Sequence, residues 1–417
     1  MSLYLYNIGI CFYDLLLCIV SWFNPKAKLL YKGRQATLQS FNTAVKNIPY
    51  TKKTYWFHVA SLGEFEQARP LIEMLKDKSP SIKILLSFFS PSGYEIRKNY
   101  KFADDIIYLP SDSAKNARKL IETYKPDVAI FIKYEFWYHY LNELNKRNIP
   151  TFLAAAKFIP TQIFFKPWGG LFRKMLGFFD VIYVQDDISC SLLKEVTKTK
   201  VIKSGDTRFD RVVEIAKSTK TLEFIEKFCE AIPTVICGST WLPDEELIFA
   251  YINQNTNKCR WIIAPHEINE SHLKKIESLC KRPSIRYSTF ASENIDEYKT
   301  KNFDVMILDT MGMLSSIYKY ATFAYIGGGF GVGIHNTLEA AVYGLPVIWG
   351  PKYLRFTEAI ELIAHNAAFS VSTQEELTNI FNTLLTDASK VKEMGEKSRF
   401  YVESKLGASE LIVKSII

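Results

Sequence analysis

Short runs of β-branched and aromatic residues alternate with longer helical patterns from about residue 54 onward, in two series. The first series is TYWFHVA (54–60), IKILLSF (82–88), DIIYLP (105–110), DVAIFIK (127–133), PTFLAAA (150–156), VIYVQ (181–185) and VIKSG (201–205). The second is TVICG (234–238), RWIIAP (260–265), DVMILD (304–309), FAYIGGG (323–329) and LPVIWGP (345–351). Several runs are apolar throughout, as strands covered by helices on both faces are. The alternation predicts an α/β protein with two parallel sheets built from βαβ units.

The alternation pauses over residues 217–232, a charged helical stretch that precedes Pro233. We therefore expect an N-terminal Rossmann-like domain over 26–220 and a C-terminal one over 221–417. The last helix of the chain could pack back on the first domain. Two such domains facing across a cleft are the plan of GT-B glycosyltransferases, which some epimerases and phosphorylases share.

An apolar, aromatic segment covers residues 3–23, interrupted by Asn7 and Asp14. The next stretch, 24–63, holds seven Lys and Arg residues and no acid, nearly the whole excess behind the net charge of +8. A signal peptide would place its basic residues first, so residues 1–25 are predicted to be a membrane anchor instead. The segment spans the bilayer once or lies in its interface, with the basic stretch on the cytoplasmic, anionic side. A helix packed within the soluble fold is the alternative.

Composition excludes several other classes. The seven cysteines are scattered without a C-x-x-C spacing, which favours a reduced, cytosol-facing protein without structural zinc. No helix-turn-helix, zinc-finger or RNA-recognition pattern accompanies the basic residues, and we expect no nucleic-acid partner.

The stretch SLGE (61–64) places a carboxylate, Glu64, just after the glycine of a strand-to-helix turn. An acid in the first helical turn complements the helix dipole, which is a sufficient structural reason for it. The mouth of a βα turn is also where α/β proteins place their chemistry. Both interpretations stay open at this point.

The stretch IGGGFGVGIHNTLEAAVYGLPVIWGP (326–351) predicts a nucleotide site. Its glycines allow close approach of the backbone to a ligand. His335 and Asn336 stand at the start of the next helix, whose free N–H groups attract anions. Glu339 follows one turn later and could accept hydrogen bonds from ribose hydroxyls. In GSTW (238–241), Ser239 or Thr240 could either help to bind a phosphate or simply cap an ordinary helix.

With these residues in view, the chain resembles the Kdo transferases, which move 3-deoxy-D-manno-octulosonic acid (Kdo) from CMP-Kdo onto a lipid A precursor. The resemblance runs from about residue 30 to 400. Its motifs are SLGE (61–64), YEFW (134–137), GDTRFD (205–210), GSTW (238–241), DTMGML (309–314) and HNTLE (335–339), together with the basic residues Lys28, Lys32 and Arg34 around Tyr31 and Gly33.

Three positions depart from the family's pattern. PHEINE (265–270) lacks an expected arginine near His266, Met313 stands where an acid is usual, and Lys157 stands in for another arginine. These departures leave the contacts to the phosphate and to the sugar carboxylate open.

The resemblance implies an inverting transfer of Kdo onto lipid IVA that releases CMP, in lipopolysaccharide inner-core synthesis. It implies Glu64 as the general base, Glu135 as a second active-site acid, and neither metal nor cofactor. Implied donor-binding residues are Ser239, Thr240, Pro265, His266, Met311, Gly312, Gly328, Gly329, His335, Asn336 and Glu339; implied acceptor-binding residues are Ser61, Gly63 and Lys157. The expected location is the cytoplasmic face of the inner membrane of a Gram-negative bacterium.

Two further assignments have alternatives. Glu135 either orients the acceptor or forms a local ion pair with Lys133 or Lys157. The aromatic and basic segment 157–179 either dips into lipid headgroups or is a core helix with a solvated edge. Rival functions are a GT-B enzyme using a UDP- or GDP-sugar, a non-catalytic membrane-tethered nucleotide-sugar-binding protein, and an epimerase.

Overall fold

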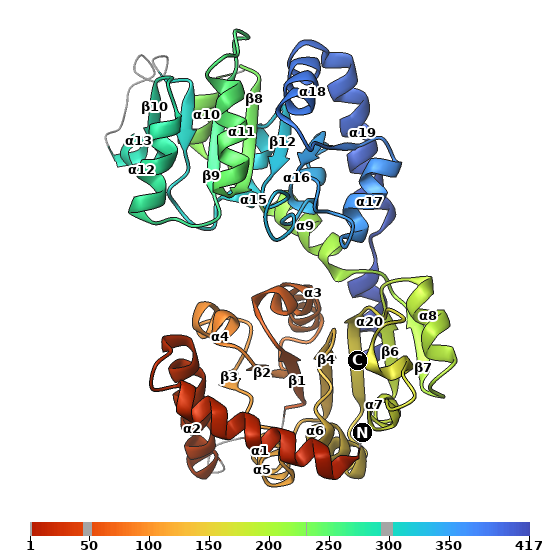
Figure 1. Ribbon diagram of the computed structural model, residues 1–417. Helices are drawn as coiled ribbons and strands as arrows, with labels where there is room; N and C mark the ends of the chain where they lie inside the picture. Colours follow the sequence, from red (N-terminus) through yellow and green to blue (C-terminus); the bar gives the residue numbers. More distant parts are fainter. Residues whose placement is uncertain (1, 45–51, 231, 293–302) are drawn as a thin grey trace. The chain divides into compact units, whose positions relative to one another are not determined.

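The computed structural model describes residues 2–44, 52–230, 232–292 and 303–417. Lys46 of the basic stretch lies outside these ranges. The chain divides into two compact units, one of residues 1–211 with 406–417 and the other of residues 212–405. Each unit contains a parallel sheet with helices packed around it, as Figure 1 shows, so the predicted α/β architecture is confirmed.

The first unit has a seven-stranded sheet in the order β3-β2-β1-β4-β5-β6-β7. The strands are β1 (Thr54–Val59), β2 (Lys83–Phe88), β3 (Asp105–Tyr108), β4 (Val128–Ile132), β5 (Thr151–Ala156), β6 (Val181–Val184) and β7 (Lys200–Lys203). The helices are α1 (Leu3–Val20), α2 (Pro25–Ala44), α3 (Leu62–Lys78), α4 (Pro91–Arg97), α5 (Ala114–Tyr124), α6 (Tyr138–Lys146), η1 (Ile163–Phe165), α7 (Gly170–Leu176), α8 (Asp187–Lys194) and α20 (Ala408–Ile416). Helix α9 (Thr207–Ser218) begins in this unit and continues into the second. Strands β1, β4 and β5 are buried along their whole length, which explains their continuous apolar runs.

The last helix completes the first unit's core. Ile412, Val413 and Ile416 of α20 pack on the apolar face of α3, which includes Leu71 and Leu75. The carboxylate of Asp210 accepts hydrogen bonds from the backbone N–H groups of Gly407 (2.8 Å) and Ser409 (2.7 Å) and so fixes the start of α20.

The second unit has a seven-stranded sheet in the order β10-β11-β9-β8-β12-β13-β14. Its strands are β8 (Thr234–Thr240), β9 (Arg260–Pro265), β10 (Ser284–Arg286), β11 (Val305–Ile307), β12 (Phe323–Ile326), β13 (Val347–Trp349) and β14 (Ala368–Ser370). Its helices are α10 (Glu223–Cys229), α11 (Leu242–Ile252), α12 (Glu270–Leu279), α13 (Tyr287–Ser292), α15 (Leu314–Ile317), η2 (Tyr318–Tyr320), α16 (Leu338–Ala341), α17 (Thr357–Ala364), α18 (Gln374–Thr386) and α19 (Ala388–Ser404). The three-residue strands β10 and β14 were not among the predicted ones.

Helix α1 is the one helix among the described residues that is long and apolar enough to cross a membrane by length and composition. One face of it packs on the first unit. Tyr6 donates a hydrogen bond to Asp112 (2.6 Å between oxygens), and Asn7 Oδ1 lies 2.7 Å from His139 Nε2. The opposite face exposes Leu5, Ile8, Phe12, Leu15, Leu16 and Ile19. The polar residues of the predicted anchor are therefore turned toward the protein.

Candidate functional site

The turn after β1 carries the first predicted catalytic residue. Ser61 has an extended backbone before α3, and Glu64 lies in the first turn of that helix. Ser61 Oγ donates a short hydrogen bond to Glu64 Oε2 and holds the half-buried carboxylate at the helix start. A Cβ on Gly63 would meet only Ser61 Oγ, at 3.8 Å, so the space beside the turn is open.

The carboxylate of Glu135 follows the neighbouring strand β4 and is only 8% exposed. Its Oε2 lies 2.9 Å from His58 Nε2 and accepts a hydrogen bond from Trp137 Nε1 at 2.8 Å. His58 lies fully buried in β1, and its Nδ1 is 2.8 Å from Ser87 Oγ. Ser87, His58 and Glu135 thus form a buried chain from a hydroxyl through an imidazole to a carboxylate.

An ion pair with Lys133 or Lys157 was the alternative role for Glu135, but its hydrogen-bonding contacts are with His58 and Trp137. Lys157 Nζ lies 3.9 Å from Asp186. Lys133 has a left-handed backbone (φ 66°), which is uncommon for a residue with a side chain and marks strain in the turn that carries Glu135.

Electrostatics link the turns after β1 and β4. Burial raises the pKa of the Tyr134 hydroxyl, and the nearby carboxylates of Asp186 and Glu64 raise it further. Because such effects fall off with distance, Tyr134 and Glu64 belong to one neighbourhood. The turns after β1 and β4 therefore bring together Ser61, Glu64 and Glu135 with the aromatic side chain of Tyr134.

In the second unit, the glycine-rich loop follows β12. A Cβ on Gly327 would lie 2.3 Å from the Ser239 carbonyl oxygen, and one on Gly329 would lie 2.6 Å from Gly350 Cα. These two glycines thus permit close packing of the protein's own backbone, whereas the sequence suggested close approach to a ligand. Gly328 has φ 92°, a conformation that favours glycine.

Three flat rings stack at the carboxyl ends of β8, β9 and β12. The His266 ring lies 4.7 Å from the Trp241 ring and 4.2 Å from the His335 ring, centroid to centroid. Trp241 Nε1 donates a hydrogen bond to His335 Nε2 at 3.0 Å, which requires an unprotonated Nε2. Burial, and then the charge of His266, lowers the pKa of His335 to about 4. His335 is therefore neutral near pH 7.

The acids that follow GSTW serve the fold. Asp244 accepts hydrogen bonds from the Gly328 and Trp241 N–H groups (2.8 and 3.0 Å) and from Tyr325 Oη (2.8 Å). Burial raises the pKa of Asp244. This carboxylate ties the glycine-rich loop to the start of α11.

The neighbouring acid Glu245 is held in the same way. Its Oε1 accepts a hydrogen bond from Thr240 Oγ1 (2.9 Å), and its Oε2 lies 2.8 Å from His272 Nε2. Burial raises the pKa of Glu245 as well. The Thr240 hydroxyl, predicted to bind the donor, is thus directed into the protein.

Asn336 and Glu339 lie together as their spacing predicted. Asn336 Nδ2 donates to Glu339 Oε1 at 2.9 Å, and Asn336 Oδ1 accepts from the Leu338 N–H at 3.2 Å. The helix expected to start at His335 is the four-residue α16, which begins only at Leu338.

The remaining donor-side residues occupy neighbouring loops. Ser239 has a left-handed backbone (φ 53°), and Pro265 ends β9 opposite Thr240. Met311 is 75% exposed, next to Gly312 (φ 87°) in the loop after β11. Within the ranges that the structure describes, no three His, Cys, Asp or Glu side chains gather as metal ligands would.

Residues 33–211 match the protein family described as 3-deoxy-D-manno-octulosonic-acid transferase (kdotransferase). The 3-deoxy-D-manno-octulosonic acid transferase of Rickettsia typhi is 27% identical over 365 residues, 85% of this chain and 77% of that protein. The enzyme of the same name from Aquifex aeolicus is 27% identical over 355 residues, 84% of this chain and 90% of that protein. The chain is thus similar to Kdo transferases over most of its length.

Solved structures agree on the fold. The UDP-GlcNAc 2-epimerase of Neisseria meningitidis has a TM-score of 0.61 and 18% identity, and the match covers 88% of this chain and 99% of that one. At this identity the likeness extends to the architecture alone.

The sequence had not singled out His58, Trp137 or Trp241 as site residues. A histidine inside an otherwise apolar strand was the available signal for His58. The signal for the two tryptophans was their place in the motifs YEFW and GSTW, which the Kdo-transferase resemblance had already drawn attention to.

Proposed function

We propose that this chain transfers Kdo from CMP-Kdo onto a lipid A precursor and releases CMP. The observation that carries the proposal is the alignment with Kdo transferases over 84–85% of the chain, which includes both units. The family match over residues 33–211 adds to it.

Glu64 is the proposed general base. Its carboxylate is half-buried, is held by Ser61, and stands beside open space at Gly63. It would take the proton of the acceptor's primary hydroxyl as the oxygen attacks the anomeric carbon, and CMP would leave with inversion. General-base catalysis typically contributes about 10²–10⁴-fold to a rate.

Glu135 is proposed as a positioning residue. Its hydrogen bonds to His58 and Trp137 fix both side chains in the turn after β4. We expect this rigid, buried group to hold the acceptor-side loops, with Lys157 near Asp186 offering a cation to the acceptor.

The loops of the second unit are proposed to bind CMP-Kdo. Neutral His335 has hydrogen-bonding capacity left at Nδ1, and Asn336 with Glu339 offers an amide and a carboxylate to sugar hydroxyls. The exposed Met311–Gly312 turn and the backbone around Gly328, Gly329 and Ser239 complete the proposed donor contacts. Basic side chains and backbone N–H groups can stabilise a leaving phosphate without metal.

The N-terminal helix is proposed to lie in the membrane interface. Its polar residues Tyr6 and Asn7 contact the first unit, and its exposed face is apolar. A helix of this kind can dip its apolar face among lipid chains while the domain stays in water. The basic residues Lys26, Lys28 and Lys32 that follow suit an anionic cytoplasmic leaflet.

Turnover tests the proposal directly. Purified protein is incubated with CMP-Kdo generated in situ and a tetraacylated lipid A precursor. The mass of the product is measured by mass spectrometry. One or more added Kdo units, with CMP but not UDP as competitor, are expected. Transfer from a UDP- or GDP-sugar instead would favour the rival GT-B function, and CMP binding without transfer would favour a binding protein.

A further inference from the structure

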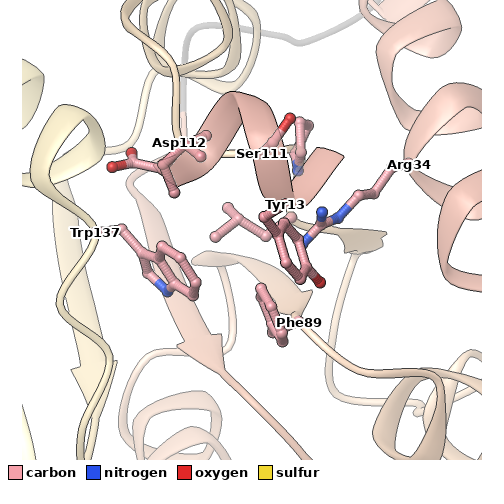
Figure 2. A pocket seen from close by; sticks show the side chains of 9 residues that line it. Tyr13, Arg34, Phe89, Ser111, Asp112 and Trp137 are labelled. Carbon is pink, nitrogen blue, oxygen red and sulfur yellow. The ribbon is translucent and has the colours of Figure 1, made fainter. Parts of the chain in front are cut away.

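A largely apolar cavity of about 260 Å³ lies between helices α1 and α2 and the loops that follow β2, β3 and β4. Its main walls are Tyr13 of α1, Arg34 of α2, and Phe89 and Trp137 of the loops, as Figure 2 shows. Ile10 of α1 lines it as well. Because these loops stand at the carboxyl ends of the strands, the cavity opens at the same sheet edge as Glu64 and Glu135.

Arg34 is the cation of this cavity, and only 5% of the residue is exposed. Its guanidinium lies 4.9 Å from the Phe89 ring centroid and 5.5 Å from that of Tyr13. Within the described part of the chain, its buried Nε and Nη1 have no hydrogen-bond acceptor. The partly exposed Asp14 carboxylate forms an ion pair with Arg34, but at 3.7 Å from Nη1 it lies beyond hydrogen-bonding distance. A buried guanidinium with unmatched donors favours an anion with oxygen acceptors.

The other charged group in the wall, the carboxylate of Asp112, has its own hydrogen-bond donors. Asp112 accepts hydrogen bonds from Tyr6 Oη (2.6 Å) and from the N–H groups of His139 (3.0 Å) and Tyr140 (3.1 Å). Its carboxylate is directed away from the cavity in Figure 2. The cavity therefore offers apolar walls and one cation.

Two neighbours connect the cavity to lipid and to the candidate site. The outer face of α1, which roofs it, exposes Leu5, Ile8 and Phe12. On the inner side, Trp137 donates to Glu135, and it also lines a second hollow of about 260 Å³ near Phe136. An acyl chain that enters this cavity from the membrane would therefore contact Trp137, whose indole N–H is hydrogen-bonded to Glu135.

We propose that this cavity binds one acyl chain of the lipid acceptor and that Arg34 binds a phosphate of the same molecule. The proposal rests on the proposed function and deepens it, since it assigns a subsite for the lipid part of the substrate. A pocket with apolar walls and one oriented charge suits an alkyl chain with an anionic group at its end.

Binding of a probe, without turnover, tests the subsite. The full chain is reconstituted in phosphatidylcholine nanodiscs and titrated with dodecyl phosphate brominated near the chain end, which quenches nearby tryptophan fluorescence. Trp137→Phe identifies the signal that comes from the cavity. Brominated dodecanol and inorganic phosphate separate the contributions of the chain and of the anion.

Three variants then locate the probe. Arg34→Met is expected to weaken dodecyl phosphate at least about tenfold and to leave the alcohol unchanged, as loss of a charge-assisted hydrogen bond implies. Ile10→Phe, which fills the cavity, should weaken both alkyl probes. Arg118→Met, which removes an exposed arginine on α5 of the same unit, should alter neither.

Several results would overturn the subsite: unchanged binding in both Arg34→Met and Ile10→Phe, equal effects of Arg118→Met and Arg34→Met, or inorganic phosphate as tight as dodecyl phosphate. Competition with phosphatidylglycerol identifies the source of the lipid. Displacement of the probe by the acylated acceptor, but not by phosphatidylglycerol at equal concentration, supports the acceptor, whereas the reverse assigns the cavity to a membrane lipid and refutes the proposal.

Turnover distinguishes a failure of the subsite from a failure of the proposed function. In an active protein, Arg34→Met should raise KM for the acylated acceptor about tenfold with little change in kcat. Probe binding without any Kdo transfer would refute the function and keep a lipid site. Transfer with an unchanged KM in Arg34→Met would refute the subsite alone.

Discussion

The carboxyl edges of the two sheets have the same architecture and carry opposite chemistry. In the first unit this edge presents Glu64 half-buried beside open space, next to the buried pair of His58 and Glu135. In the second unit the acids Asp244 and Glu245 are buried and fully engaged within the fold. There the partly exposed positions belong to the rings of Trp241 and His335 and to a glycine-rich loop.

The comparison separates two uses of a carboxylate at the start of a helix. Glu64 and Asp244 both follow a strand and both lie in the first turn of the next helix. Asp244 accepts three hydrogen bonds from its own unit, whereas the hydrogen bond that holds Glu64 comes from Ser61. The first arrangement stabilises a loop, and the second leaves oxygen lone pairs for a substrate. The following predictions test this division.

Replacing the proposed base should give the largest effect. Glu64→Gln is expected to lower kcat at least about a hundredfold, because general-base catalysis is lost while the size of the side chain is kept. Thermal unfolding should be nearly unchanged. Glu122→Gln, an exposed acid on α5, is the matched control and should retain full activity. Equal activity of Glu64→Gln and wild type would make Glu64 a helix-dipole residue and direct attention to Glu135.

Replacing the buried acid Asp244 is expected to change stability, in contrast to Glu64→Gln. Asp244→Ala should lower the free energy of unfolding by about 3 kcal/mol or more, because three buried donors lose their acceptor at about 1–3 kcal/mol each. Urea denaturation measures the change, with Glu246→Ala, an exposed neighbour on α11, as control. Equal stability of the two variants would contradict the structural role assigned to Asp244.

His335 should make stability depend on pH. Its pKa is lowered from 6.5 to about 4 in the fold, so the unfolded chain binds this proton more readily. The stabilising contribution is present above about pH 6.5 and is lost as the pH falls toward 4. Urea denaturation at pH 7 and pH 4.5 should show a smaller loss in His335→Gln than in wild type. The same loss in both would refute the neutral, hydrogen-bonded imidazole.

The smallest expected effect concerns two lysines with left-handed backbone, Lys125 (φ 45°) after α5 and Lys133 (φ 66°) after β4. Glycine at either position should stabilise the protein by about 1 kcal/mol, because the steric penalty is removed. Only Lys133→Gly should also reduce turnover, since it loosens the turn that carries Glu135. Thermal unfolding and kcat measured together decide this, and reduced turnover in Lys125→Gly would contradict it.

Hydrophobic pattern was enough to predict most of the fold. Each of the twelve predicted runs contains a strand, because buried strands of parallel sheets are apolar without interruption. Strands β10 and β14 are only partly buried and lack an uninterrupted apolar run, whereas the equally short β11 and β13 are fully buried and apolar. The interface between α1 and the first unit depends on long-range contacts such as Tyr6 with Asp112, and no local periodicity encodes those.

The site was predicted less completely, for a related reason. Asn336 and Glu339 are one helical turn apart, and their contact follows from spacing. His58 and Glu135 are 77 positions apart and meet because β1 and β4 are neighbours, which the order of strands along the chain does not reveal. The close approach of Gly327 to Ser239 and of Gly329 to Gly350 was not foreseen, because sequence cannot distinguish approach to a ligand from approach to the protein's own backbone.

The return of helix α20 to the first unit has a consequence for biosynthesis. Ile412, Val413 and Ile416 belong to the core of a unit whose other residues end at Arg211. A ribosome must therefore synthesise the entire second unit before the first can close its core. Until then the apolar surface of α3 that receives α20 stays uncovered, while α1 has already emerged. The nascent chain could thus reach the membrane before its first domain is complete.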